Sequence, residues 1–166
     1  NVDGGYNTGL GRGTLHENVS GDRNVAVGDG ALYGVKNDFN IGIGYNAGSN
    51  ITTGSQNIIL GYNVDAASTT GNGQLNIGNI IFGTGITGTG KASSGNVSIG
   101  TSSPFAKFSV QGSYGDTTTL FDIASTTSAG FATSSLFKVL ANGNVGVGTS
   151  TPAYRLDVDG NARVNG

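Results

Sequence analysis

The first 82 residues repeat one short pattern every 16 or 17 positions. Each copy starts with an asparagine, continues with alternating aliphatic residues and ends with a glycine four positions later. The copies cover residues 7–11, 24–28, 40–44 and 57–61, and a weaker fifth copy begins at Asn76-Ile77. A fixed period of this length predicts a stack of equivalent units, because one unit is too short to bury its own apolar face.

Each unit of 16 or 17 residues is hereafter called a rung. Within the short pattern that begins each rung, the apolar side chains recur at every second position. This is the period of a β-strand with one buried face. The residues expected to form the core of the rungs are Val25, Val27, Ile41, Ile43, Ile58 and Leu60. Gly28, Gly44 and Gly61 close the copies, where a left-handed or bulged backbone would turn the chain.

The asparagine that begins each rung has two interpretations. Asparagines at equivalent places in stacked rungs can form a ladder of side-chain amides, or asparagine can simply favour the turn before the strand. In both cases one rung cannot fold alone. Ordering each of its residues costs roughly 1 to 2 kcal/mol, whereas burying each of its few aliphatic side chains returns only roughly 1.5 to 3 kcal/mol.

A second repeat lies further along, where residues 95–112 align with residues 143–160 at an offset of 48 and nine of 18 positions are identical. Each copy predicts a strand, a Gly-Thr-Ser-x-Pro turn and another strand. Pro104 and Pro152 fit the turn because proline lacks a backbone N–H donor. The expected core residues of these copies are Val97, Ile99, Val145 and Val147. Between the copies, residues 120–123 and 136–139 echo each other 16 positions apart.

Composition decides between disorder and order for such a chain. Half of the 166 residues are glycine, asparagine, threonine or serine, and only 36% are hydrophobic. Disordered chains of this kind usually have a high net charge, whereas this chain carries −2. Glycine or a β-branched residue interrupts every candidate helical window. We therefore predict an all-β chain of short strands and tight turns.

Several classes of function are excluded by what the sequence lacks. It has no run of 18 apolar residues that could insert into a membrane and no basic cluster that would bind nucleic acid. Without cysteine it has neither a disulfide scaffold nor a thiolate metal site. We expect no catalytic, metal-binding or cofactor-binding residues, and hence no enzyme.

Two resemblances follow from the repeats. The rungs resemble the head repeats of trimeric autotransporter adhesins. The Gly-Asn-Val-Gly-Val-Gly-Thr units, as at residues 143–149, resemble repeats found upstream of the endosialidase-type chaperone in phage tail fibres, tailspikes and bacterial surface proteins. The resemblance implies a parallel β-roll or solenoid, then β-prism or triple-β-helix shaft repeats, in a homotrimer. A homotrimer is also favoured because a chain so poor in apolar residues gains by sharing one axial core.

We accordingly expect three regions: a β-roll over residues 1–82, a glycine-rich hinge over 83–94 and a shaft over 95–166. The expected function is that of a structural segment of an extracellular fibre, on a cell surface or virion, which presents a binding tip. The partner is the chain itself, with a host-surface glycan or protein as a further candidate. Tyr45 and Tyr62 are candidate surface residues for such binding, and packing at rung corners is their other interpretation.

Other motifs match parts of known kinds of site but lack residues or elements that those sites require. The glycines around Lys91 fit part of a phosphate-binding loop, but a turn follows where a helix is required. His16 is an isolated surface histidine, and Asp157 with Asp159 lacks the remaining ligands of a calcium loop. Asn18, Asn50 and Asn96 begin glycosylation sequons.

Two alternative functions remain open. One is a polysaccharide-degrading or polysaccharide-binding tailspike segment, for which Asp116 and Asp122 are the best available acidic pair. The other is a subunit of a surface filament that assembles end to end.

Overall fold

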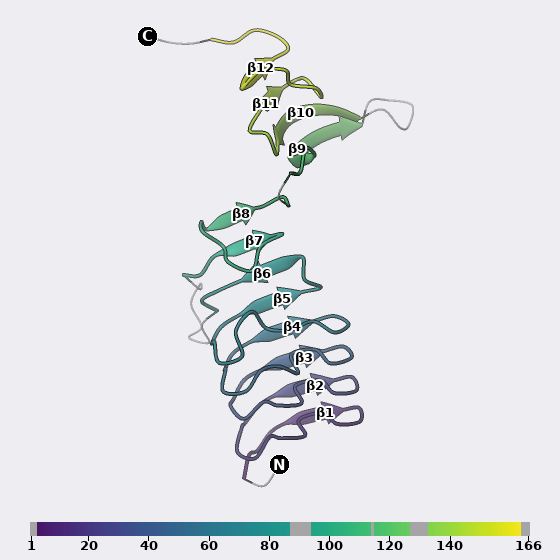
Figure 1. The fold of residues 1–166 in the computed structure, drawn as a ribbon, viewed down its shortest axis with the longest axis vertical. Helices are drawn as coiled ribbons and strands as arrows, with labels where there is room; N and C mark the ends of the chain where they lie inside the picture. Colours follow the sequence, from purple (N-terminus) through teal and green to yellow (C-terminus); the bar gives the residue numbers. More distant parts are fainter. Residues whose placement is uncertain (1–2, 87–93, 114, 127–132, 164–166) are drawn as a thin grey trace. The chain divides into compact units, whose positions relative to one another are not determined.

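The computed structural model describes residues 3–86, 94–113, 115–126 and 133–163, and within these ranges the fold is all-β with no helix. No segment in that part of the chain could therefore cross a membrane as a helix. Most strands are three residues long, and two are eight residues long (Figure 1). The strands are β1 (Thr8–Leu10), β2 (Val25–Val27), β3 (Ile41–Ile43), β4 (Ile58–Leu60), β5 (Leu75–Ile77), β6 (Ile81–Gly83), β7 (Val97–Ile99), β8 (Phe108–Val110), β9 (Thr119–Thr126), β10 (Thr133–Leu140), β11 (Val145–Val147) and β12 (Leu156–Val158).

The chain forms two compact units, an N-terminal unit of Asn1–Ser109 and a C-terminal unit of Val110–Gly166. The glycine-rich segment expected as a hinge does not separate them. Its residues 87–93 lie outside the described residues, and the strands on either side of it, β6 and β7, pair with each other. The sequence repeats and the compact units thus divide the chain at different places.

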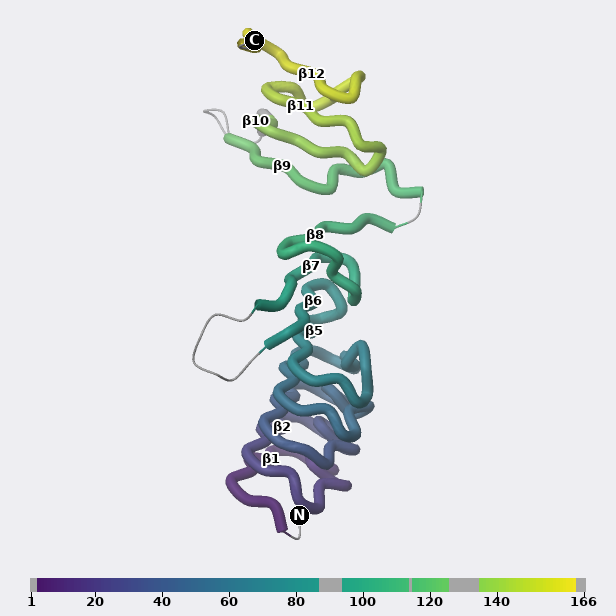
Figure 2. The backbone as a smooth tube through the Cα atoms, turned by 90° about the vertical axis from the view of Figure 1, so that its left-hand side faces the viewer, coloured from purple at the N-terminus to yellow at the C-terminus, as the bar shows by residue number. Residues whose placement is uncertain are grey.

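In the N-terminal unit, β1 to β5 pair in parallel in chain order, each strand against the same strand of the next rung (Figure 1). The register joins Val25 to Ile41 and Ile41 to Ile58, so it reproduces the period of the sequence. The fifth rung differs from expectation. Ile58 pairs with Leu75, so the place of the leading asparagine is taken by Gln74 rather than by Asn76. Figure 2 shows each rung of this unit lying on the one before it in the sequence.

The parallel run ends after β5. Gly78 and Asn79 both have positive φ, at 60° and 57°, and the Ile80 N–H donates to the Ile77 carbonyl at 3.1 Å, so residues 78–80 form a tight turn. This turn reverses the chain, so that β6 lies antiparallel to β5 and β7 lies antiparallel to β6. The Gly-Asn pair is a local signal for such a turn in the sequence.

The leading asparagines form a buried ladder, which decides between the two interpretations of that residue. Oδ1 of Asn24 accepts the backbone N–H of Asn40 at 2.8 Å, and Oδ1 of Asn40 accepts that of Asn57 at 3.1 Å. Each Nδ2 also donates to a carbonyl of a turn, as from Asn40 to Gly54 at 2.9 Å. Gln74 ends the ladder, because its backbone N–H donates to Asn57 Oδ1 at 2.8 Å. Every buried side-chain N or O atom in the described residues has a partner, as burial requires.

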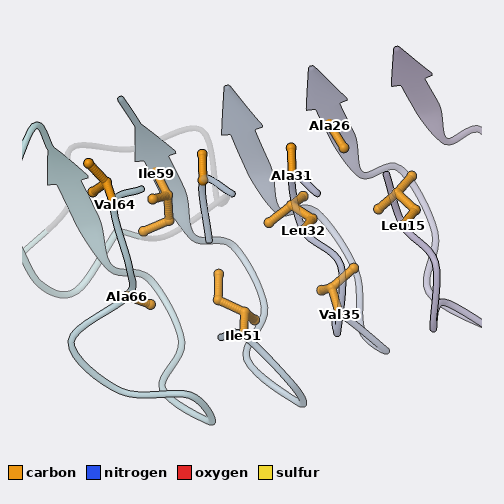
Figure 3. Close-up of a cluster of buried hydrophobic side chains, with 10 residues drawn as sticks. Leu15, Ala26, Ala31, Leu32, Val35, Ile51, Ile59, Val64 and Ala66 are labelled. Atoms are coloured by element: carbon orange, nitrogen blue, oxygen red, sulfur yellow. The ribbon is translucent and has the colours of Figure 1, made fainter. Parts of the chain in front are cut away.

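The interior of the rungs is narrow and is filled mainly from the returning loops. Leu32, Val35 and Ile51, which lie outside the strands, are fully buried there (Figure 3). Strands β2, β3 and β4 each contribute only their middle residue, Ala26, Gly42 and Ile59. At Gly42 an added Cβ would lie 2.7 Å from Leu32 Cγ, so the loop side chains leave little room on the inner side of the sheet.

The C-terminal unit contains the second sheet, in the order β12-β11-β10-β9. The two segments that echo each other are the partners of a long hairpin, with Phe137 opposite Ile123 and Val139 opposite Phe121. β11 and β12 flank the Gly-Thr-Ser-x-Pro turn and pair in parallel rather than as a hairpin.

Both copies of the second repeat use the same two side-chain clamps. The leading asparagine donates Nδ2 to the proline carbonyl eight residues later, from Asn96 to Pro104 at 3.2 Å and from Asn144 to Pro152 at 3.0 Å. A cation three residues after the proline donates to the backbone that precedes the asparagine. Arg155 Nη1 donates to the Asn142 carbonyl at 2.7 Å, and Lys107 Nζ donates to the Ser94 carbonyl.

Candidate interaction surface

An apolar face runs along the outer side of the first sheet. The first and third residues of each strand point away from the rung interior, while the middle residue points into it, as the burial pattern of β2 and β3 shows. The residues expected to form the rung core, Val25, Val27, Ile41, Ile43, Ile58 and Leu60, therefore lie on this outer face rather than inside. The interior is too thin for them, because Leu32 and its equivalents already fill it.

The outer face forms two aliphatic columns that follow the pairing register. One column contains Val25, Ile41, Ile58 and Leu75, and the other contains Val27, Ile43, Leu60 and Ile77. Ile43 is 43% exposed and Ile77 is 36% exposed in the single chain. Beyond the hairpin, Ile81 and Ile99 extend the second column. Soluble monomers rarely expose so continuous an apolar surface, and such surfaces mark sites of association.

The shaft repeats show the same exposure. Of their expected core residues, Val97, Ile99 and Val147 are exposed, and Val145 is half-buried. The strand residues Phe108 and Leu156 are even more exposed, at 57% and 64%. The buried hydrophobic core of the described residues lies entirely in the N-terminal unit, so the C-terminal unit has no comparable core of its own.

Two lines of side chains, called here the N-rim and the C-rim, flank the strands of the first four rungs. The N-rim precedes the strands and consists of Tyr6, Arg23, Phe39 and Gln56. The C-rim follows the closing glycines and consists of Arg12, Asp29, Tyr45 and Tyr62. All N-rim residues have φ between 54° and 61°, and this left-handed backbone turns the chain into the strand. The N-rim borders the outer face directly, because Phe39 and Gln56 line a cavity of about 240 Å³ together with Ile41, Ile58 and Ile86.

Aromatic and cationic side chains stack along both rims. The Cζ atom of Arg23 lies 5.2 Å from the ring centroid of Tyr6 and 5.6 Å from that of Phe39, within the range of cation–π contacts. On the C-rim, the rings of Tyr45 and Tyr62 stack with centroids 5.3 Å apart. Tyr45 and Tyr62, the candidate binding residues, are thus exposed but already partnered with each other on one face.

Glycine and proline residues occupy the turns next to the strands. Gly28, Gly44 and Gly61 follow β2, β3 and β4 with φ between 120° and 130°, a region that favours glycine. An added Cβ at Gly44 would lie 2.2 Å from the Gly61 carbonyl oxygen. Pro104 and Pro152 lie in the turns between the paired strands, and their carbonyls accept the asparagine clamps.

The acidic residues considered for catalysis are engaged in local structure. Asp122 forms an ion pair with Lys138 at 3.3 Å and accepts a hydrogen bond from Ser135 at 3.1 Å. Asp116 accepts two hydrogen bonds from Thr118, through its hydroxyl at 2.6 Å and its backbone N–H at 2.8 Å. These bonds lower the pKa of Asp116 below its usual value, which is the opposite of what a general acid needs.

The parts of the chain that the structure describes contain no cluster of side chains that could hold a metal ion. No three His, Asp or Glu side chains come together there. Asp157 accepts the backbone N–H of Ala153 at 2.9 Å and so caps its own turn. His16 is exposed and stacks on Tyr33, with ring centroids 4.6 Å apart. Lys91 lies outside the described residues.

The sequon asparagines also have structural partners. Asn18 is buried and its side chain bonds both backbone polar groups of Gly21. Asn50 bonds both backbone polar groups of Ala66, in the next rung. Asn96 forms the clamp to Pro104. Attachment of a glycan would disrupt these bonds.

Sequence reasoning found the strands but missed the rims and the full length of the outer face. Leu75 alternates with Ile77 in the sequence, but a fifth rung that begins at Asn76 does not include it. Comparison with protein-family models, curated proteins and solved structures finds no match for this chain.

Proposed function

We propose that this chain is a structural segment of an extracellular homotrimeric fibre, on a cell surface or virion, which presents a binding tip. The observation that supports it most is the outer face, where two aliphatic columns, half-buried to exposed in the single chain, run along the sheet from β2 to β7. Its burial against copies of the same chain would stabilise the assembly, because each large aliphatic side chain removed from water contributes roughly 1.5 to 3 kcal/mol.

The proposed architecture is a β-roll or solenoid followed by β-prism or triple-β-helix shaft repeats, with the outer faces of three chains turned toward a common axis. Rotational symmetry about an axis along the stack closes such an assembly without leaving one face uncovered. The shaft supports this arrangement in the same way, since Val97, Ile99, Val147 and Leu156 are all exposed in one chain. Three copies would supply the apolar core that the C-terminal unit lacks.

The role of the segment would be mechanical. Continuous hydrogen bonding from rung to rung, with a buried amide ladder inside, resists stretching and local opening because few backbone groups are free to exchange partners. A host-surface glycan or protein would be bound by the tip, or by exposed aromatic residues such as Tyr62. The engagement of Asp116 and Asp122 gives no support to a polysaccharide-degrading function.

The mass of the native assembly in solution tests this proposal. Multi-angle light scattering should give three times the chain mass of 16.6 kDa over a wide range of concentration. A chain that stays monomeric at tens of micromolar would contradict the proposal, since its outer face would then be stable in water.

A further inference from the structure

A hollow of about 420 Å³ lies in the turns that follow the closing glycines of the first three rungs. None of its lining residues belongs to the aliphatic columns of the outer face. We propose that this hollow binds a saccharide that carries a carboxylate group. The site adds a binding function to the structural one. Because the hollow is formed within one chain, the inference does not rest on the homotrimer.

Glycine at one position of the first two rungs opens the hollow. Gly13 and Gly30 line it, whereas Asn46 and Asn63 hold the equivalent position in the third and fourth rungs. All four residues have φ between 51° and 69°, a left-handed region that asparagine also adopts. An added Cβ at Gly13 would make only an ordinary contact, 3.7 Å from Tyr33 Cδ2. Steric crowding therefore does not explain glycine there, and its effect is to leave space.

Three polar side chains line the hollow in order along the stack, Arg12 from the first rung, Asp29 from the second and Asn46 from the third. Neighbouring rungs are about 5 Å apart, so the series spans about 10 Å. In the described part of the chain, none of these side chains forms a hydrogen bond or an ion pair. The backbone beneath them is already paired, because the Gly30 N–H donates to the Arg12 carbonyl at 2.9 Å and the Asn46 N–H donates to the Asp29 carbonyl at 2.8 Å. A ligand would therefore be recognised by the side chains.

The order of these groups indicates the class of ligand. The Arg12 guanidinium offers a fork of N–H donors that matches a carboxylate. The Asp29 carboxylate only accepts hydrogen bonds, so beside it the ligand needs donors rather than a second anion. The Asn46 amide both donates and accepts, which suits hydroxyl groups. One carboxylate at one end of a ligand that is otherwise rich in hydroxyl groups is the pattern of an acidic sugar, such as a uronic acid.

Two aromatic rings supply the apolar part of the hollow. Tyr33 and His16 both line it, and their rings stack with centroids 4.6 Å apart and planes 10° apart. The C–H groups of a sugar ring can pack against these rings, and small-molecule sites commonly combine such apolar lining with a few polar groups that fix the orientation. The volume of the hollow also lies within the roughly 300 to 1,000 Å³ of such sites.

A ligand-observed NMR titration of the full chain with sodium glucuronate tests the proposal. We expect saturable binding with a dissociation constant on the order of 1 mM. Glucose lacks the carboxylate and acetate lacks the hydroxyl groups, so each should bind at least about tenfold more weakly, as expected for the loss of charge-assisted or multiple hydrogen bonds.

Arg12→Gln removes the cation and keeps an amide, and it should weaken the binding of glucuronate at least about tenfold. The matched control is Arg23→Gln, which makes the same change of charge outside the hollow. Glutamine is compatible with the backbone there, because Gln56 holds the equivalent position with φ 60° against 54° at Arg23. This control should leave the affinity unchanged.

Gly13→Asn introduces the residue of the third and fourth rungs and should narrow the hollow, again weakening binding at least about tenfold. The matched control is Gly78→Asn, where φ is also positive and nothing lies within 4 Å of an added Cβ. Far-ultraviolet circular dichroism should show the wild-type strand content in both variants. If Gly13→Asn fails to fold, the two arginine variants decide the test.

The outcomes separate this inference from the proposed function. Binding of glucuronate that Arg12→Gln weakens and Arg23→Gln does not supports the saccharide site. No binding at tens of millimolar, equal binding of glucose or acetate, or equal weakening by variant and control overturns it. Tighter binding of glycine than of glucuronate would assign the hollow to a ligand with an ammonium group and also overturns it. None of these results depends on the mass of the assembly, so the site and the homotrimer fail separately.

Discussion

At the scale of single residues, stability depends on polar side chains that hold the rungs together. The amide of Asn40 accepts the backbone N–H of Asn57 and donates to the carbonyl of Gly54, all out of contact with water. A buried donor or acceptor that loses its partner costs more than a surface hydrogen bond contributes. Asparagine therefore performs here the structural work that large apolar side chains perform in most domains.

We expect Asn40→Ala to lower the free energy of unfolding by about 2 to 4 kcal/mol, because it leaves the Asn57 N–H and the Gly54 carbonyl without partners. The control is Asn37→Ala. Asn37 also bonds across rungs, to the Thr53 carbonyl at 2.7 Å, but it is exposed, so its loss should cost less than about 1 kcal/mol. Urea unfolding at one protein concentration measures both. Equal losses would show that the buried ladder has no special weight.

Glycine at the strand ends is required for a second reason, the close approach of neighbouring rungs. Gly44→Ala would place a Cβ against the Gly61 carbonyl at a positive φ and should destabilise the chain by at least about 2 kcal/mol. Gly78→Ala is the matched control, since its φ is also positive but nothing lies within 4 Å. It should cost only about 1 kcal/mol. Thermal unfolding distinguishes the two variants.

The hydrogen bonds from Thr118 lower the pKa of Asp116, with the side-chain bond as the larger cause. A carboxylate with a lowered pKa contributes stability above its unfolded pKa, and this contribution is lost as the pH falls through the folded pKa. Thr118→Ala should therefore raise the pKa of Asp116, as read from carboxyl carbon shifts in an NMR titration. An unchanged pKa in that variant would show that the hydroxyl is not the cause.

At the scale of elements, the three-residue strands are too short to be stable singly and owe their position to the loops around them. In the shaft repeat, the turn between β11 and β12 is closed by the bond from Asn144 to the Pro152 carbonyl and by Arg155 on Asn142. The same pair of clamps recurs at Asn96 and Lys107. The identities between the two copies therefore include residues that close the turn as well as residues that face a core.

Asn144→Ala should open this turn, because the Pro152 carbonyl loses its donor. We expect hydrogen exchange of the amides in β11 and β12 to accelerate roughly tenfold, equivalent to about 1.4 kcal/mol. Asn161→Ala, at an exposed position after β12, should leave the exchange unchanged. Exchange that stays slow in Asn144→Ala would mean that strand pairing alone holds the turn.

At the scale of the whole molecule, the exposed outer face is the feature with the largest consequence. Ile43 is 43% exposed in one chain, so a polar substitution there should leave the rung intact. In the proposed trimer, Ile43→Glu would bring three carboxylates into the shared core, where unpaired charges are strongly destabilising. We expect light scattering of this variant to give the monomer mass of 16.6 kDa at micromolar concentration.

The matched control for that experiment is Ala67→Glu, which adds the same charge at an exposed loop position away from the outer face. It should keep the mass of the wild-type assembly. Far-ultraviolet circular dichroism should show the same strand content in both variants. If Ile43→Glu keeps the assembly mass, the aliphatic columns are not the surface through which the chains associate.

The sequence by itself determined the local structure. Alternating residues placed the strands at Val25–Val27, Ile41–Ile43 and Ile58–Leu60, and glycine placed their ends, because both signals depend on backbone geometry within a few residues. Only the tertiary structure decided which face of each strand is inside. Alternation defines two faces without saying which one a returning loop will cover, and Leu32, Val35 and Ile51 take the inner side and leave the larger aliphatic residues outside. The rims likewise join residues 16 or 17 positions apart, and their order became visible only when the rungs were stacked.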